Sequence, residues 1–429
     1  MSKKNQNDLA WEKLFEKYDI LREIEVDDCF YISAEKIKEF REPRLMAKFD
    51  HEVNLPKIFS DNQLAILPIT RGEYVISHFE AYKKFEDNNS SLTKFSLPSY
   101  LQSLNYDNIT NEAIALNCAV ASGIISDFVE DENILATVSG RMSSGEFSFY
   151  IDDVKSKNSH KINVNNSQIE IDAGYEGMSS LLLIEAKLEL ADDFLVRQLY
   201  YPFRTWQSRI VKPIRPIFFV YSNGIFRLFE YAFENIYNYN SLRLIKQKNY
   251  SLEDSNIALT DIQEILERVV IINEPRVPFP QADKFERVIN LCELLNINEL
   301  SRQNVTETYD FATRQTNYYT DAAYYLGLLE KNSNDEDEIV YSLTDIGRRI
   351  FNSSFKQRQL SLCESILSHK VFNEALYLYL KKAVAPSVDE IVEIMKQANI
   401  YNVRSGETFK RRASTVKGWI SWIISLINE

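Results

Sequence analysis

The stretch IEIDAGYEGMSSLLLIEAKLEL, residues 169–190, decides the fold that the sequence predicts. It reads as two neighbouring strands, because both halves are rich in aliphatic residues that favour a pleated, buried backbone. Asp172 ends the first strand, and Glu185 and Lys187 lie two residues apart on the second. Side chains alternate across a strand, so Glu185 and Lys187 face the same side. The pattern therefore predicts two carboxylates and one ammonium group close together.

Phosphodiester hydrolysis with a metal ion needs such a set of groups. Mg²⁺ prefers oxygen ligands and keeps several waters, so Asp172 and Glu185 suffice as side-chain ligands, and the backbone carbonyl of Ala186 can supply a further oxygen. The metal ion lowers the pKa of the attacking water, and Lys187 orients that water or offsets the growing charge. We expect Mg²⁺ as the cofactor, with Mn²⁺ able to substitute.

The pattern has an alternative interpretation as a surface strand with a Glu–Lys pair. The run LLLIEAK favours the catalytic interpretation, because it places an acid and a lysine in an otherwise apolar strand, where unpaired charge is costly. Glu170 lies on the same face as Asp172 by alternation and is a possible substitute ligand.

The spacing D-x12-E-x-K across two strands resembles the PD-(D/E)XK nuclease superfamily, although no proline precedes Asp172. The resemblance implies an α+β or α/β fold, with a mixed-sheet, restriction-endonuclease-like core flanked by helices. It also implies an acid on the preceding helix and a polar residue on the following one, which Glu112 and Gln198 match. Glu112 is equally well explained as a favourable first-turn charge on its helix.

Several segments carry candidate DNA contacts. Residues 305–331 have the form of a helix-turn-helix, and residues 338–351 follow as a strand and a helix, which together suggest a winged helix. Near the C-terminus a helix with a basic first half and an apolar second half, which contains Trp419 and Trp422, is suited to a phosphate backbone or to a dimer seam. Arg141 before a strand suits a phosphate contact or a plain turn. The candidate DNA-binding residues are Arg314, Gln315, Asn317, Tyr318, Lys410, Arg411, Arg412 and Arg141.

The 429 residues divide into three expected parts. Residues 1–98 form a small α+β unit, for which DNA recognition is one interpretation. Residues 99–272 form the nuclease core, in which 110–129 reads as one buried helix, Pro202 breaks or kinks a helix, and Asn223-Gly224 is the turn of a hairpin. A proline-rich linker at 273–283 leads to an almost wholly helical part at 284–429.

Composition narrows the class of protein. The net charge of −13 disfavours a protein that coats nucleic acid without specificity, because such affinity comes from neutralising phosphates. The four cysteines are far apart, which fits a reducing compartment. No apolar segment suits a signal sequence or a membrane span, so we expect a cytoplasmic, prokaryotic protein.

The sequence thus favours a type II restriction enzyme: a sequence-specific, Mg²⁺-dependent endonuclease acting on double-stranded DNA. We expect a homodimer, because palindromic sites match two-fold symmetry, and a functional pairing with a DNA methyltransferase. Two alternatives remain open. One is a nuclease of DNA repair or of a mobile element, and the other is a non-catalytic winged-helix regulator.

Overall fold

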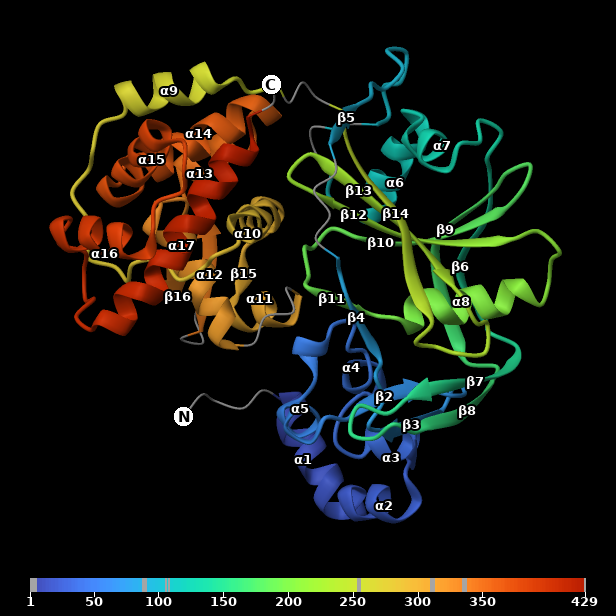
Figure 1. Cartoon of the computed structure of the whole chain (residues 1–429). Helices are drawn as coiled ribbons and strands as arrows, with labels where there is room; N and C mark the ends of the chain where they lie inside the picture. Colours follow the sequence, from blue (N-terminus) through green and yellow to red (C-terminus); the bar gives the residue numbers. More distant parts are fainter. Residues whose placement is uncertain are drawn as a thin grey trace.

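The structure is a computed structural model that describes residues 6–86, 91–104, 106, 109–252, 256–308, 313–333 and 338–427; the side chains of 307–308 and 313–315 lie outside the description. The chain forms three lobes (Figure 1). The N-terminal lobe lies below a central lobe built on a large sheet, and the C-terminal lobe packs beside the central one. The chain is therefore mixed α and β, as the sequence predicts.

The N-terminal lobe is a three-stranded sheet, in the order β1-β3-β2, with helices on one face. Side chains alternate along β2, so Ile66 packs against the helices of this lobe. Ala65 and Leu67 face the opposite way, toward the ribbon of β7 (Glu146–Asp152) and β8 (Ser159–Asn165) in the central lobe. The two lobes thus share one apolar core. The elements are α1 (Gln6–Tyr18), α2 (Ile20–Asp27), β1 (Phe30–Ser33), α3 (Ala34–Lys38), α4 (Pro43–Met46), η1 (Glu52–Asn54), α5 (Lys57–Asn62), β2 (Ala65–Pro68) and β3 (Glu73–Ser77).

The central lobe is built on a seven-stranded sheet in the order β5-β14-β13-β12-β10-β9-β6. β9 pairs antiparallel with β6 on one side and with β10 on the other, and β12 runs parallel to β10. The strands are β4 (Tyr82–Lys84), β5 (Leu92–Lys94), β6 (Leu135–Ser143), β7 (Glu146–Asp152), β8 (Ser159–Asn165), β9 (Gln168–Glu176), β10 (Leu181–Lys187), β11 (Asp193–Leu195), β12 (Ile214–Ser222), β13 (Ile225–Phe233) and β14 (Leu242–Ser251). β4 and β5 lie in the range expected for the N-terminal unit, yet they pair with β11 and β14.

Helices cover both faces of this sheet. The expected single helix at 110–129 is wrong: the segment forms α6 (Glu112–Ala121) and α7 (Ile124–Val129), because Gly123 between them adopts a left-handed φ of 86°. On the opposite face α8 (Arg197–Gln207) packs against β9, β10 and β12. The expected break at Pro202 does not occur, since α8 continues through it, with its apolar residues buried against the sheet.

The hairpin turn at Asn223-Gly224 is confirmed. β12 and β13 pair from Ser222 and Ile225 outward, and the two turn residues have φ angles of 54° and 71°. Positive φ at both positions is what a two-residue turn of this kind requires. The turn also contacts the C-terminal lobe, because the amide of Asn223 exchanges hydrogen bonds with Gln359.

Replacing Gly224 by alanine is expected to destabilise the protein more than the same change at Gly145. Both glycines have a φ near 70°, so alanine strains the backbone by about 1 kcal/mol at either position. A Cβ at Gly224 would also lie 2.8 Å from Cδ2 of Phe355, whereas no atom lies within 4 Å at Gly145. Urea unfolding of the two variants measures the difference. Equal losses of unfolding free energy in the two variants would show that the turn at Gly224 does not pack closely against the C-terminal lobe.

The C-terminal lobe contains a small antiparallel sheet, β15-β17-β16, so the expectation of an almost wholly helical region is only partly met. Trp419 and Trp422 are buried in the core of this lobe rather than presented as a seam for a second chain. No described helix has the length and apolar character needed to cross a membrane. The elements are α9 (Leu259–Arg268), α10 (Phe285–Ile297), β15 (Leu300–Ser301), α11 (Arg302–Thr308), α12 (Thr313–Tyr325), β16 (Leu329–Ser333), β17 (Ile339–Leu343), α13 (Asp345–Phe351), α14 (Phe355–Leu367), α15 (Lys370–Lys382), α16 (Val388–Gln397) and α17 (Gly406–Ser425).

Candidate active site

The candidate site lies where β9 and β10 part. Their register runs from Leu181 opposite Glu176 to Ile184 opposite Ala173, and Asp172 and Glu185 are the next residues on the two strands. The backbone N–H of Ala186 donates to Oδ2 of Asp172 over 2.8 Å. The carboxylate of Asp172 thus accepts from the backbone of β10 next to Glu185.

Glu185 and Lys187 form the centre of the site. Nζ of Lys187 donates to Oε1 of Glu185 over 2.9 Å, and Nε2 of Gln198 donates to the same oxygen over 2.7 Å. The side chains of Glu185 and Lys187 are only 11% and 12% exposed. Gln198 lies on the first turn of α8, so this helix and β10 together fix the position of the Glu185 carboxylate.

The electrostatics of these groups are strongly perturbed. Burial raises the pKa of Glu185 to about 7, and the nearby Asp172 adds to the rise, while Lys187 opposes it. Desolvation by the surrounding protein also raises the pKa of Asp172. Burial alone would lower the pKa of Lys187, but Glu185, Asp50 and Glu189 hold it well above the ordinary value. Glu185 therefore gains and loses its proton near neutrality, whereas Lys187 stays charged.

Asp50 is a member of the site that the sequence did not predict. Its Oδ2 lies 3.4 Å from Nζ of Lys187, and it comes from the N-terminal lobe, 137 residues earlier in the chain. No local pattern links the two positions, because the contact depends on how two lobes pack. The signal in the sequence is a polar pair, Asp50-His51, beside the apolar Phe49.

The other predicted core residues lie around this centre. Glu112 is the first residue of α6 and is half-buried, near enough to contribute to the raised pKa of Asp172. Glu170 is exposed and accepts from Nε of Arg141 over 3.2 Å. Arg141 lies within β6, so its interpretation as a plain turn is wrong, whereas the expected strand after it is present as β7.

The donor set fits a hard divalent cation. Desolvation raises the pKa of Asp172, Glu185 and Glu189, because burial disfavours their ionised forms, and a bound cation would offset that cost. Among the described residues no three His, Cys, Asp or Glu side chains converge closely enough to hold a metal ion by themselves. Two carboxylates and several waters are a set that Mg²⁺ accepts.

A small pocket opens beside Glu185 and Gln198. Its volume is about 10 Å³, which is about the space that one water molecule occupies. The pocket is lined by Glu170, Ile171, Leu183, Ile184, Glu185, Gln198, Leu199 and Pro202. Most of the lining is apolar, but Glu170, Glu185 and Gln198 can supply the polar partners that an ordered water needs.

The candidate DNA contacts in the C-terminal lobe lie on α12 and α17. Asn317 and Tyr318 are half-buried, while the side chains of Arg314 and Gln315 lie outside the described residues. Lys410 and Arg411 are exposed near the start of α17. Arg412 is half-buried, and burial lowers its pKa, which the nearby Tyr318 and Asp321 of α12 oppose. The basic start of α17 and the C-terminal half of α12 thus lie close together.

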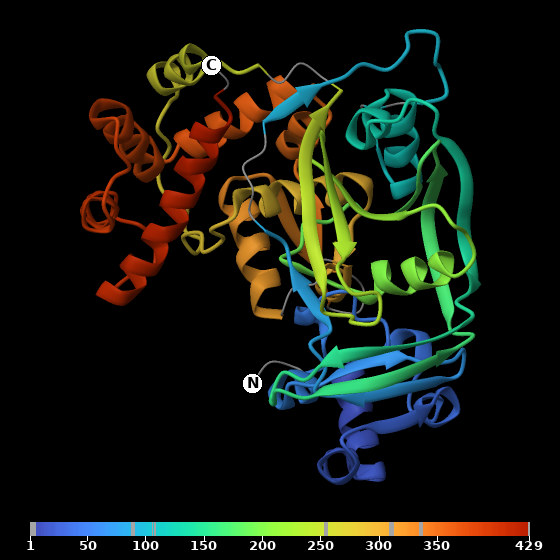
Figure 2. The ribbon, with the colours of Figure 1, turned by 45° about the vertical axis from the view of Figure 1, so that its right-hand side comes forward.

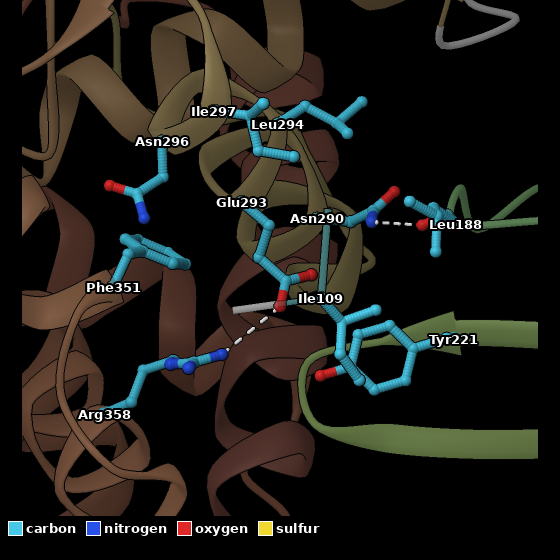
Figure 3. Close-up of a pocket in the computed structure, with 10 residues that line it drawn as sticks. All are labelled: Ile109, Leu188, Tyr221, Asn290, Glu293, Leu294, Asn296, Ile297, Phe351 and Arg358. Carbon is cyan, nitrogen blue, oxygen red and sulfur yellow. Dashed lines mark hydrogen bonds and ion pairs between the residues drawn. The ribbon is translucent and has the colours of Figure 1, made fainter. Parts of the chain in front are cut away.

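The C-terminal lobe is joined to the strand that carries Lys187. The side chain of Asn290 donates to the carbonyl of Leu188 over 2.8 Å and accepts from the N–H of Leu190 over 3.1 Å. Glu293 accepts from the backbone N–H of Asn223 and from Arg358. Figure 3 shows these side chains around a pocket of about 60 Å³ between the two lobes. The three-lobed arrangement is also visible after a 45° rotation (Figure 2).

Comparison with known proteins divides the chain in a similar way but assigns no activity. Three family models match it: a domain of unknown function (DUF6996) over residues 8–76, a domain of unknown function (DUF6997) over residues 77–251 and a domain of unknown function (DUF7226) over residues 287–428. No curated protein and no solved structure matches the chain. Asp50 falls in the first matched region, and Asp172, Glu185 and Lys187 fall in the second.

Proposed function

We propose that the protein is a Mg²⁺-dependent endonuclease that hydrolyses phosphodiester bonds of double-stranded DNA, of the type II restriction class. The observation that carries the proposal is the buried Glu185, held by Lys187 and Gln198 beside Asp172 at the point where β9 and β10 part. Strongly perturbed acids next to a specific cation are typical of functional sites.

Each residue has a definite part in the proposed reaction. Asp172 and Glu185 would hold the metal ion, with the Ala186 carbonyl as a further oxygen donor, and the metal would polarise the phosphate and activate water. Lys187 carries a fixed positive charge that offsets charge growing on the phosphate. Gln198 restricts the rotation of Glu185 through its hydrogen bond to Oε1.

The order of elements supports a restriction-endonuclease-like core. A helix with an acid, α6, comes before the antiparallel strands β6, β9 and β10, and α8 with Gln198 leads to the parallel strand β12. In the C-terminal lobe the order helix, strand, two helices and a two-stranded hairpin, from α10 to β17, supports a winged helix. The proposed DNA contacts of the C-terminal lobe are Arg314, Gln315, Asn317 and Tyr318 on α12 and Lys410, Arg411 and Arg412 on α17.

The proposal extends to partners and compartment. A homodimer would match the symmetry of a palindromic site, and a DNA methyltransferase of the same prokaryotic cytoplasm would protect that site. A nuclease of repair or of a mobile element would use the same residues on other substrates, and a winged-helix regulator would use only the C-terminal lobe.

The wild-type protein is expected to cut unmethylated phage DNA into discrete fragments with Mg²⁺ or Mn²⁺ and to leave it intact with a chelator. Sequencing of the fragment ends gives the recognition sequence and the cut position. Diffuse or end-directed degradation would favour the repair nuclease. Binding without cleavage of any of several unmethylated genomes, in either metal, would contradict the enzyme and favour the regulator.

A further inference from the structure

We propose that Asp50 is a positioning residue for Lys187, so that the N-terminal lobe completes the candidate active site. Its catalytic meaning rests on the proposed function, but the contact itself does not. Nothing in the spacing of Asp172, Glu185 and Lys187 requires an acid from another lobe, so the assignment comes from the packing of this chain.

The geometry places Lys187 between two carboxylates. Its Nζ is 2.9 Å from Oε1 of Glu185 and 3.4 Å from Oδ2 of Asp50, and the Asp50 side chain is 15% exposed. On its outer side Asp50 lies 3.7 Å from Lys48, whose side chain is 60% exposed and held less firmly. A surface pair of this kind contributes little, whereas a buried pair has no water to replace a lost partner.

The segment that carries Asp50 is fixed to the central lobe. The backbone N–H of Leu195 donates to the carbonyl of Asp50 over 2.8 Å, and the N–H of Glu52 donates to Oδ1 of Asp193 over 3.0 Å. His51 is buried and contacts the backbone carbonyl of Asp193. β11, which contains Asp193 and Leu195, thus anchors the residues on both sides of the Asp50 side chain.

Asp50 gives Lys187 a second carboxylate partner, which matters because Glu185 has two proposed roles. Oε1 of Glu185 accepts hydrogen bonds from both Lys187 and Gln198, yet Glu185 is also a proposed metal ligand. When Glu185 serves as a ligand, it holds Lys187 less strongly. Asp50, whose Oδ2 lies 3.4 Å from Nζ of Lys187, is then the carboxylate that keeps the ammonium group in place.

The test measures Lys187 directly in metal-free protein without DNA. Wild type, Asp50→Asn and the control Glu52→Gln are treated with a small amine-reactive reagent over a range of pH, and each lysine is quantified by peptide mass mapping. Glu52 is an exposed acid of the same segment. The groups that face Lys187 are Glu185, Asp50 and Glu189, and those that face Asp50 are Lys187, Lys48, Arg197 and His51.

We expect labelling of Lys187 to rise about tenfold in Asp50→Asn, because its ammonium group then loses one of the two carboxylates that hold it and is more open to the reagent. Lys212, which is paired with Glu176 away from the site, serves as an internal reference. A rise at both lysines would report general unfolding and would count against a specific contact. Labelling of Lys187 within twofold of wild type, or the same rise in Glu52→Gln, overturns the proposal.

A cleavage assay adds a separate readout. In Asp50→Asn kcat is expected to fall at least tenfold, with little change in KM for duplex DNA, because the DNA-binding lobe is untouched. An unchanged kcat alongside increased labelling would leave the contact in place but remove its catalytic role, which also overturns the proposal. If the wild type cuts nothing, the labelling result still decides whether Asp50 positions Lys187.

Discussion

Lys187→Ala is expected to bind duplex DNA with wild-type affinity and to cleave it about 10²–10³-fold more slowly, the usual cost of removing one preorganised group that stabilises developing charge. Lys187 lies at the end of β10, far along the chain from the proposed DNA-binding helices α12 and α17. The loss should therefore appear in kcat rather than in KM. Single-turnover cleavage and a gel-shift assay in Ca²⁺ or chelator measure the two properties separately.

Lys212→Ala is the matched control for this change. Lys212 also pairs with a glutamate of the same sheet, Glu176, over 2.6 Å, but at the opposite end of β9. The Lys212→Ala variant should cleave duplex DNA at the wild-type rate. Cleavage by Lys187→Ala at a wild-type rate, or equal losses in the two variants, would remove Lys187 from the reaction.

Glu185→Gln is expected to be inactive yet more stable than the wild type. Burial raises the pKa of Glu185 from 4.5 to about 7, so keeping this carboxylate ionised costs the folded state on the order of 3 kcal/mol. Glutamine has the same shape and no charge, and it removes this cost together with a proposed metal ligand. Substitution of a residue that serves function at a cost in stability typically gives a more stable but less active protein.

The difference in stability between the wild type and Glu185→Gln depends on pH. Between pH 4.5 and 7 the unfolded chain has released the Glu185 proton and the folded chain has not, so the wild type loses stability relative to Glu185→Gln as pH rises. The difference should be near zero below pH 4.5 and should level off above pH 7. Urea unfolding at pH 5 and pH 8 measures it. Glu176→Gln should show no such trend, and a wild type that is the more stable protein at pH 8 would contradict the burial argument.

The local part of the site could be predicted from the sequence because its residues are neighbours on regular strands. Glu185 and Lys187 share a face by alternation, and their ion pair follows from a spacing of two. Gln198 matches the polar residue that the resemblance implies on the next helix, and it lies in the first turn of that helix. The hairpin at Asn223-Gly224 was equally local, since the turn needs two residues that accept positive φ.

Contacts between residues far apart in the sequence could not be predicted. Asp50 reaches Lys187 only through the packing of two lobes, and no periodicity carries that information. A plain turn was one of two interpretations of Arg141, because small polar residues surround it, but pairing with β9 overrides the weak propensity of that segment. The helix expected at 110–129 has an apolar pattern throughout, and only the backbone of Gly123 reveals that two helices divide it.

The joint between the central and C-terminal lobes has a mechanical consequence. Several hydrogen bonds cross it, among them those of Asn290 and Glu293, and such bonds exchange with water at little net cost. Two of these attachments are to Leu188 and Leu190, shortly after Lys187. If the proposed function holds, a load placed on the C-terminal lobe by a bent or tightly gripped duplex would pull on the end of β10, so that gripping and cutting would be linked by force through the backbone.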